Sequence, residues 1–227
     1  MTVVTDSLRQ TGGQRRMTLQ EFLTYDDGTD DLRSVFDHRR YQLVDGVLIE
    51  MGAESTGNLR IAMFLIDYFL KIVGFERVGI KEKIEVRSRF ATARDTDIII
   101  HSEASSLALD GRSEACLFWG EPNPLVVIEV VSPGNESKLN YKRDYEQKPV
   151  EYADGRRPTG GHRGISEMWQ IDPLREWVRV GTLINKEYQF ETFMEQETIV
   201  SQSFPALNLT ASQVLSAGRT SLVRKLK

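Results

Sequence analysis

The sequence predicts an α/β fold in which helices flank a mixed central β-sheet. Two strongly apolar segments, "LVVIEVVSP" and "TDIIIH", are typical of strands that are buried on both faces of a sheet. In the apolar segment 59–73 the charged residues share one narrow helical face, which predicts a helix. Two turn-forming pairs, Asp45-Gly46 and Asn185-Lys186, each separate two strand-like segments, so we expect an N-terminal and a C-terminal hairpin.

Short local patterns assign the elements that precede the central sheet. Residues 1–16 show no periodicity, and we expect them to form a disordered tail before a single domain over residues 17–227. Thr18 followed by Glu21 is a capping box, which predicts a short helix. After the first hairpin, the helix 59–73 is apolar almost all round, so it is either deeply buried or contacts a partner subunit in a homodimer.

The segments that follow the helix 59–73 supply the strands of the central sheet. Four segments, "KEKIEVR", "TDIIIH", "LVVIEVVS" and "SEMWQID", predict strands, and the charged stretch "ESKLNYKRDYEQKPVEYADG" between the last two predicts a helix. The segments "EWVRVGTLI" and "EYQFETFM" predict the C-terminal hairpin, and "LTASQVLSA" predicts a short helix capped by Thr210.

The composition is that of an ordinary soluble protein, with 40% hydrophobic and 27% charged residues. A net charge of −4 gives no global attraction to nucleic acid, although a local basic cleft is compatible with it. The single cysteine, Cys116, cannot form an internal disulfide, so the chain fits the reducing cytoplasm, and we interpret this thiol as a small core residue. The N-terminus shows no secretory signal, and the 59–73 segment is shorter than the roughly 20 residues that span a bilayer.

Two carboxylates interrupt the most apolar strands, and they define the candidate site. Asp97 precedes "IIIH" and Glu129 lies within "VVIEVVSP". An unpaired carboxylate is costly in a buried strand, so Glu129 requires a cation. If the two strands are neighbours, the acids converge, and Mg²⁺ is their natural partner because it is bound by one or two carboxylates and several waters.

The predicted helix that follows offers a second charged pair. Asp144 and Lys148 are spaced i,i+4, so they share a helical face, and Lys148 is a candidate proton donor or electrostatic stabiliser. A structural alternative remains open at this point. Asp97 would then cap a strand, Glu129 would pair with a buried Arg or Lys, and Asp144 with Lys148 would form a surface ion pair of little energetic value.

Five segments, in this order along the chain, resemble a known family: "YQLVDGVLIEM", "RDTDIII", "PLVVIEVVSPG", "KRDYEQKPVEYA" and "ISEMWQIDP". They are similar to those of the bacterial Uma2 family of restriction endonucleases, within the PD-(D/E)XK nuclease superfamily. The resemblance runs from about Met17 to "LTASQVLSA". It implies a restriction-endonuclease-like core and hydrolysis of DNA phosphodiester bonds that depends on Mg²⁺, with Mn²⁺ as a substitute.

The resemblance also implies the roles of individual residues. Asp97 matches the aspartate of the family's "PD" motif and Glu129 the acidic residue on the next core strand, which makes both of them metal ligands. The backbone carbonyl of Val130 is implied to complete the metal shell. Glu50, at the end of the first hairpin, is a candidate for an additional glutamate ligand.

The lysine of the superfamily is displaced in this chain. Its usual position, two residues after Glu129, holds Val131, whereas Lys148 fits a "D…K…Y" pattern with Asp144 and Tyr152 and is the implied catalytic lysine. Pro149 follows it directly, and a proline inside a helix removes a hydrogen bond and disfavours helix at the preceding residue.

Other positions depart from the family's pattern. Thr96 replaces the proline before the aspartate, and Gln42 stands where many members carry a glutamate. The basic, glycine-rich segment 154–164 is longer than the usual turn. The histidines lack ligand spacing, which argues against zinc, and we interpret His101 as structural. The departures leave an alternative function open, that of a catalytically degenerate nuclease fold that binds nucleic acid or a protein.

Overall fold

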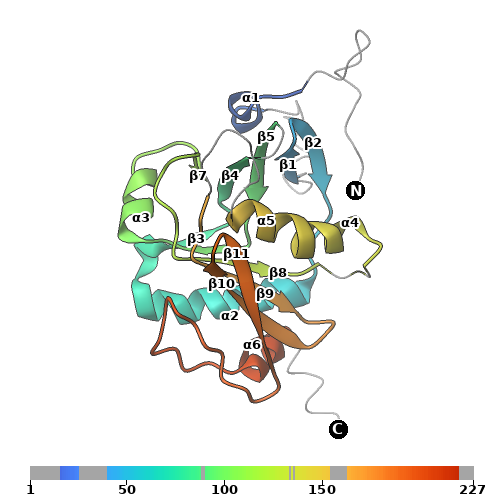
Figure 1. Cartoon of the computed structure of the whole chain (residues 1–227), viewed down its shortest axis with the longest axis vertical. Helices are drawn as coiled ribbons and strands as arrows, with labels where there is room; N and C mark the ends of the chain where they lie inside the picture. Colours follow the sequence, from blue (N-terminus) through green and yellow to red (C-terminus); the bar gives the residue numbers. More distant parts are fainter. Residues whose placement is uncertain are drawn as a thin grey trace, which may run out of the picture.

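Two mixed β-sheets, one above the other in Figure 1, form the centre of the fold. The structure is a computed structural model, and it describes residues 16–25, 40–87, 90–132, 134, 136–153 and 163–219. The expected tail up to residue 15 and most of the segment 154–164 therefore lie outside the described residues, as do His38 and His162.

Each sheet contains one parallel pair of strands, and its other pairs are antiparallel. The five-stranded sheet has the order β2 (Val47–Met51), β1 (Arg40–Val44), β5 (Ala91–Asp95), β4 (Lys83–Arg87) and β7 (Cys116–Leu117). The six-stranded sheet has the order β11 (Glu187–Met194), β10 (Trp177–Ile184), β9 (Glu167–Asp172), β8 (Val126–Val130), β6 (Ile98–Ile100) and β3 (Val78–Ile80). The parallel pairs are β4 with β7 and β8 with β9.

Helices surround these sheets and also lie between them. The helical elements are α1 (Leu19–Leu23), α2 (Thr56–Val73), η2 (Phe75–Arg77), α3 (Glu103–Leu109), α4 (Leu139–Tyr141), η3 (Lys142–Gln147), α5 (Lys148–Ala153) and α6 (Ala211–Ala217). Figure 1 shows α4 and α5 at the level between the two sheets, and α2 and α6 at the level of the lower sheet and beneath it. The α/β class with a mixed sheet and flanking helices is confirmed, although the strands divide into two sheets instead of one.

The six-stranded sheet is covered on both faces. On one face Ile98 and Ile100 of β6 pack with Leu65 and Phe69 of α2 in the largest core cluster. On the other face Ile99, which points the opposite way, packs in a cluster with residues of α5 and of β4. Because β8 lies between these two cores, all five of its residues are buried, as expected for a strand with both faces covered.

The predicted local signals are present. Thr18 and Thr210 each cap a short helix, with capping boxes completed by Glu21 and Gln213. The two hairpins are β1–β2 and β10–β11, and their turns contain the expected pairs at residues 45–46 and 185–186. Asp45, Asn185 and Lys186 adopt the positive φ values that such tight hairpin turns require.

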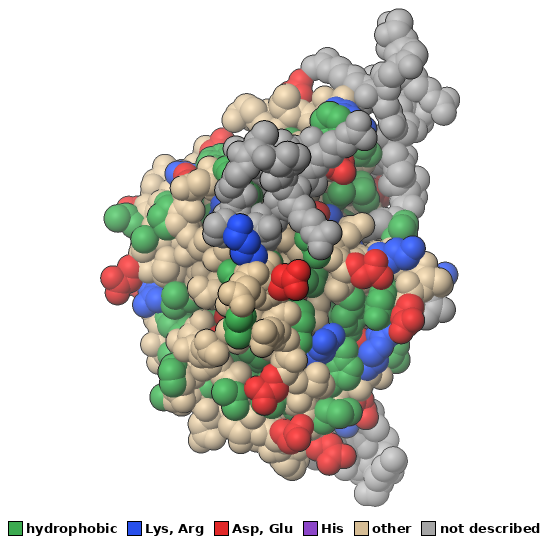
Figure 2. All heavy atoms as spheres, viewed as in Figure 1, with side chains coloured by type: hydrophobic (Ala, Val, Ile, Leu, Met, Phe, Trp, Pro, Cys, Tyr) green, Lys and Arg blue, Asp and Glu red, His purple; other side chains and the backbone are tan. Residues whose placement is uncertain are grey.

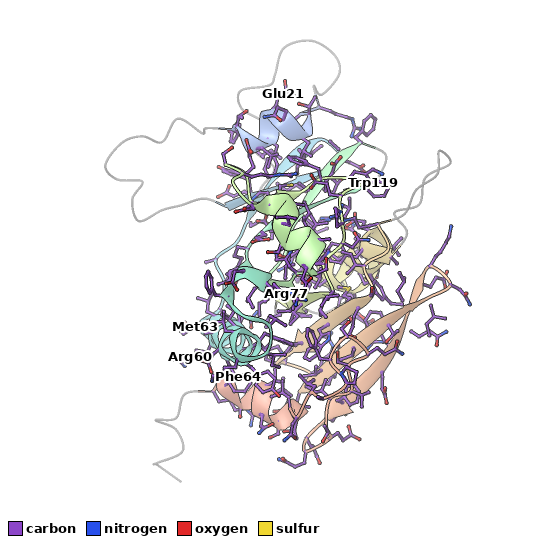
Figure 3. All side chains as sticks on the ribbon, turned by 90° about the vertical axis from the view of Figure 1, so that its left-hand side faces the viewer. Glu21, Arg60, Met63, Phe64, Arg77 and Trp119 are labelled. Atoms are coloured by element: carbon purple, nitrogen blue, oxygen red, sulfur yellow. The ribbon has the colours of Figure 1, made fainter. Side chains whose placement is uncertain are left out.

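Helix α2 buries one face and exposes another that is partly apolar. Leu65 and Phe69 are fully buried, whereas Met63 is 67% exposed. In Figure 3, Arg60 and Met63 lie on the side of α2 that faces away from the sheet. The homodimer through this helix stays a prediction. In the part of the chain that the structure describes, no helix combines the length and apolar character needed to cross a membrane.

Candidate active site

The junction between the two sheets brings the two predicted acids together. The chain leaves the upper sheet at Asp95, the last residue of β5, and enters the lower sheet at Ile98, the first residue of β6. Strand β6 pairs with β8, which meets the condition for convergence of the two acids, and Asp97 lies beside the end of β8. Asp97 Oδ2 accepts a hydrogen bond from the backbone N–H of Val130 at 2.7 Å, and Asp97 and Glu129 line one pocket of about 360 Å³.

Glu129 is a deeply buried acid of this pocket, with 3% of its surface exposed. Its Oε2 accepts a hydrogen bond from Lys148 Nζ at 2.6 Å, and its Oε1 accepts one from the hydroxyl of Tyr152 at 2.9 Å. The pKa of Glu129 is raised to about 7; burial is the largest cause, the Lys148 ammonium opposes it, and the charges of Asp97 and Asp144 contribute to the increase.

A π-helix places Lys148 on Glu129 in spite of the following proline. Residues 142–147 form the π-helix η3, and the N–H of Lys148 donates to the carbonyl of Arg143, five residues earlier. Pro149 has no N–H and ends this hydrogen-bond pattern, while α5 continues from Lys148. The Lys148 ammonium also donates to the carbonyl of Asp95 at 2.9 Å, so it connects α5 to both sheets.

Three charged residues of the pocket were not identified from the sequence: Glu54, Lys81 and Arg143. Lys81 Nζ forms an ion pair with Asp97 Oδ1, and it also contacts Glu54 Oε1 at 2.8 Å. The guanidinium of Arg143 donates to both oxygens of Asp144, at 2.6 and 2.9 Å. These residues belong to turns or charged stretches without a distinctive spacing, so no sequence signal separated them from surface charges.

The other two expected ligands are Glu50 and the carbonyl of Val130, and only Val130 is part of the pocket lining. Glu50 lies on β2 opposite Tyr41 and is not part of the pocket lining; Glu54, four residues later, is. The carbonyl of Val130 does reach the pocket. It also accepts a weak hydrogen bond at 3.4 Å from the side chain of Asn58, near the start of α2. The structure thus brings Asp97, Glu129, Val130 and Lys148 together, without Glu50.

The remaining departures from the family's pattern have structural roles. Gln42 is buried, and its Oε1 accepts a hydrogen bond from Arg94 at 3.2 Å. Thr96 donates through its backbone N–H and its hydroxyl to the carbonyl of Glu82. His101 is buried between Ser105 and Glu82, at 3.0 and 2.8 Å, as a structural histidine would be.

The donor atoms of the pocket suit a hard divalent cation. Carboxylates outnumber cationic side chains in its lining, five to three: Glu54, Asp95, Asp97, Glu129 and Asp144 against Lys81, Arg143 and Lys148. Among the residues that the structure describes, no three His, Cys, Asp or Glu side chains are grouped as a metal centre. A site with two carboxylates is nevertheless sufficient for Mg²⁺, which retains several waters.

Most of the chain is similar to a known protein family and to a solved structure. The model of the family Uma2, described as "Putative restriction endonuclease", matches residues 19–212. A crystal structure of a putative nuclease belonging to DUF820 from Anabaena variabilis is similar to this chain with a TM-score of 0.61 and 17% sequence identity. The alignment covers 89% of this chain and 99% of the other, and at this identity it shows a shared fold. No curated protein matches the chain.

Proposed function

The chain belongs to the Uma2 family, and from this premise we propose that it is a Mg²⁺-dependent endonuclease that hydrolyses phosphodiester bonds of DNA. One observation carries the proposal. Asp97 and Glu129, from the neighbouring segments of β6 and β8, line a single pocket in which Lys148 lies 2.6 Å from Glu129. Two acids and a lysine are the residues that the PD-(D/E)XK superfamily uses.

Each of the three residues has a distinct proposed role. Asp97 and Glu129, with the carbonyl of Val130, hold Mg²⁺ or Mn²⁺ through oxygen atoms. Such an ion lowers the pKa of a bound water and neutralises charge on the phosphate under attack. Lys148 orients the attacking water or stabilises the developing negative charge, because its ammonium is held at the acids by Glu129 and the carbonyl of Asp95.

The surroundings of these residues restrict how they move. Asp97 is oriented by the N–H of Val130, and Glu129 is oriented by the hydroxyl of Tyr152. Groups that are fixed before the substrate binds need no reorganisation during the reaction, which is how phosphate chemistry is accelerated by positioning and electrostatics. Acidic and basic side chains are interspersed on the face shown in Figure 2, in keeping with the small net charge, so we expect DNA contacts to be local to the site.

A second candidate function is favoured by the ion pairs of the pocket. Asp97 and Glu129 are each paired with a lysine, so the negative charge of both carboxylates is compensated without a metal ion. A catalytically degenerate nuclease fold that binds nucleic acid or a protein partner would have this property. Cytoplasmic location stays a prediction in either case.

Plasmid cleavage and metal binding separate the two functions. We expect the wild type to nick supercoiled plasmid with Mg²⁺ or Mn²⁺ and to be inactive with EDTA. Asp97→Asn and Glu129→Gln should each lower the rate by about 100-fold or more, because each removes a charged metal ligand. Asp67→Asn is the matched control, since Asp67 is an exposed carboxylate on α2.

Circular dichroism would establish that the variants remain folded. Absence of cleavage by the wild type, together with absence of divalent-ion binding in calorimetry, would contradict the nuclease function and support the degenerate one.

A further inference from the structure

Lys81 is the cation that contacts Asp97 from the outer side of the pocket. It lies in the turn between β3 and β4, and its ammonium contacts Asp97 Oδ1 and, at 2.8 Å, Glu54 Oε1. Its side chain is 31% exposed, whereas that of Asp97 is 13% exposed. Asp97, the acid that is proposed as a metal ligand, is thus the less exposed member of this ion pair.

The two oxygens of Asp97 have different partners, and this limits where a metal ion can bind. Oδ2 accepts the N–H of Val130 at 2.7 Å, inside the fold, and Oδ1 is paired with Lys81. A divalent ion on Asp97 would lie a few ångströms from the Lys81 ammonium if the lysine stayed in place. Two cations at that separation repel each other strongly in a partly buried pocket. Metal binding and the Lys81–Asp97 ion pair therefore compete.

The backbone of Lys81 is held in place, so only its side chain can respond to this competition. Lys81 has a φ of 56°, a left-handed conformation that persists when the surroundings impose it. Its N–H donates to the carbonyl of Asp97 at 3.3 Å. The next residue, Glu82, is fixed through its carbonyl by Thr96 and through its carboxylate by His101.

The ammonium has a second region within its reach. Lys81 also lines a neighbouring pocket of about 320 Å³ together with Tyr41 and Glu114. A lysine side chain has four flexible carbons, so it can leave Asp97 without a change in the backbone. Lys81 thus lies at the boundary of two pockets, and its ammonium can reach into either of them.

We propose that Lys81 is the counter-ion of Asp97 in the metal-free protein, where its ammonium also contacts Glu54. When a divalent ion binds to Asp97, the ammonium leaves this carboxylate. This inference rests on the proposed function, since it takes Asp97 as a metal ligand. Because the backbone of the turn is fixed, the released ammonium stays within reach of the neighbouring pocket that Lys81 also lines.

Removal of the Lys81 charge should strengthen metal binding, which is the opposite of what the loss of a ligand does. We expect Lys81→Met to bind Mn²⁺ about tenfold more tightly than the wild type in titration calorimetry, because a competing positive charge is gone. Its melting temperature without metal should be lower than that of the wild type, and Mn²⁺ should raise it by a larger amount. Lys81→Gln, which can still donate to both carboxylates, should show the same tighter binding with a smaller loss of stability.

Lys71→Met is the control. Lys71 also has an acidic partner, Asp67 at 2.5 Å on α2, but neither residue lines the pocket, so the Mn²⁺ affinity of this variant should equal that of the wild type. Unchanged or weaker Mn²⁺ binding by both Lys81 variants would overturn the inference. If the wild type still cleaves plasmid in that case, the nuclease proposal stands and only the role of Lys81 is lost. If none of the proteins binds Mn²⁺, both proposals fail.

Discussion

Arg94 and Glu151 join the upper sheet to the helix that carries the candidate catalytic lysine. The guanidinium of Arg94, on β5, donates to both carboxylate oxygens of Glu151, on α5, at 2.6 and 2.7 Å. It also donates to Gln42 on β1 and to Gln147 at the end of η3. Arg94 is 1% exposed, so these contacts are shielded from water. The position of Lys148 therefore depends on an arginine that contacts neither Asp97 nor Glu129.

Replacement of this arginine should destabilise the whole protein. We expect Arg94→Met to lower the free energy of unfolding by about 3–5 kcal/mol, because it leaves the Glu151 carboxylate, only 12% exposed, without its partner. Urea denaturation of the metal-free protein measures this change. Arg219→Met is the control, since the Arg219–Glu176 pair is 65% and 64% exposed and is expected to contribute less than about 1 kcal/mol. Equal stability of the two variants would contradict a positioning role for Arg94.

The hydroxyl of Tyr152 should affect both stability and metal binding. It donates to the Glu129 carboxylate at 2.9 Å, so Tyr152→Phe is expected to cost about 1.5–3 kcal/mol, the range for hydrogen bonds to charged groups. It should also weaken Mn²⁺ binding by about 10- to 100-fold, because it orients a ligand. Urea denaturation and titration calorimetry measure the two effects.

Tyr188→Phe is the control for this prediction. The Tyr188 hydroxyl is partly buried and donates to the carbonyl of Ile165 at 2.8 Å, away from the pocket. We expect this variant to lose about 0.5–1.5 kcal/mol and to keep the Mn²⁺ affinity of the wild type. If both variants bind Mn²⁺ equally, Tyr152 is a stabilising residue and not an orienting one.

Cys116 should make stability depend on pH in the alkaline range. The thiol is fully buried on β7, and burial raises its pKa to about 12 from the ordinary value of 9.0. Between these values the unfolded chain releases the thiol proton and the folded chain keeps it, so the stability from this residue is complete below pH 9 and is lost as the pH rises towards 12. Each pH unit in this window should cost up to about 1.4 kcal/mol.

Comparison with Cys116→Ser isolates this effect. The stability of the wild type, from urea denaturation at pH 8, 9, 10 and 11, should fall more steeply than that of the variant, because serine does not titrate there. The native thiol should also be unreactive towards alkylating reagents at pH 8 and react after unfolding. Parallel pH curves would show that the thiol titrates normally in the folded state.

The sequence predicted the local elements and the inner part of the site. Apolar periodicity and turn residues identified the two hairpins, α2 and β8, and the carboxylate in a buried strand pointed to Glu129. The pairing of β6 with β8 was only a condition of the predicted site, and the family resemblance implied the role of Lys148; the structure shows both the pairing and the contact of Lys148 with Glu129.

Long-range pairing could not be predicted in the same way. Lys81 and Glu54 are 27 residues apart and meet only after both sheets have formed, and the Arg94–Glu151 pair spans 57 residues. Periodicity states which residues are buried but not which strand lies next to which, so the division into two sheets was not foreseen. The prediction of Glu50 instead of Glu54 as a pocket residue has the same cause. Glu54 lies beyond the end of β2, so the alternation of residues along that strand gives no information about it.

The passage of the chain through Thr96 and Asp97 bears on when the candidate site can assemble. These two residues are the direct covalent link from β5 in one sheet to β6 in the other. Glu129 on β8 and Lys148 at the start of α5 come later in the chain. A chain that ends before Lys148 lacks one of the groups of the pocket, so the candidate site can be completed only late in synthesis.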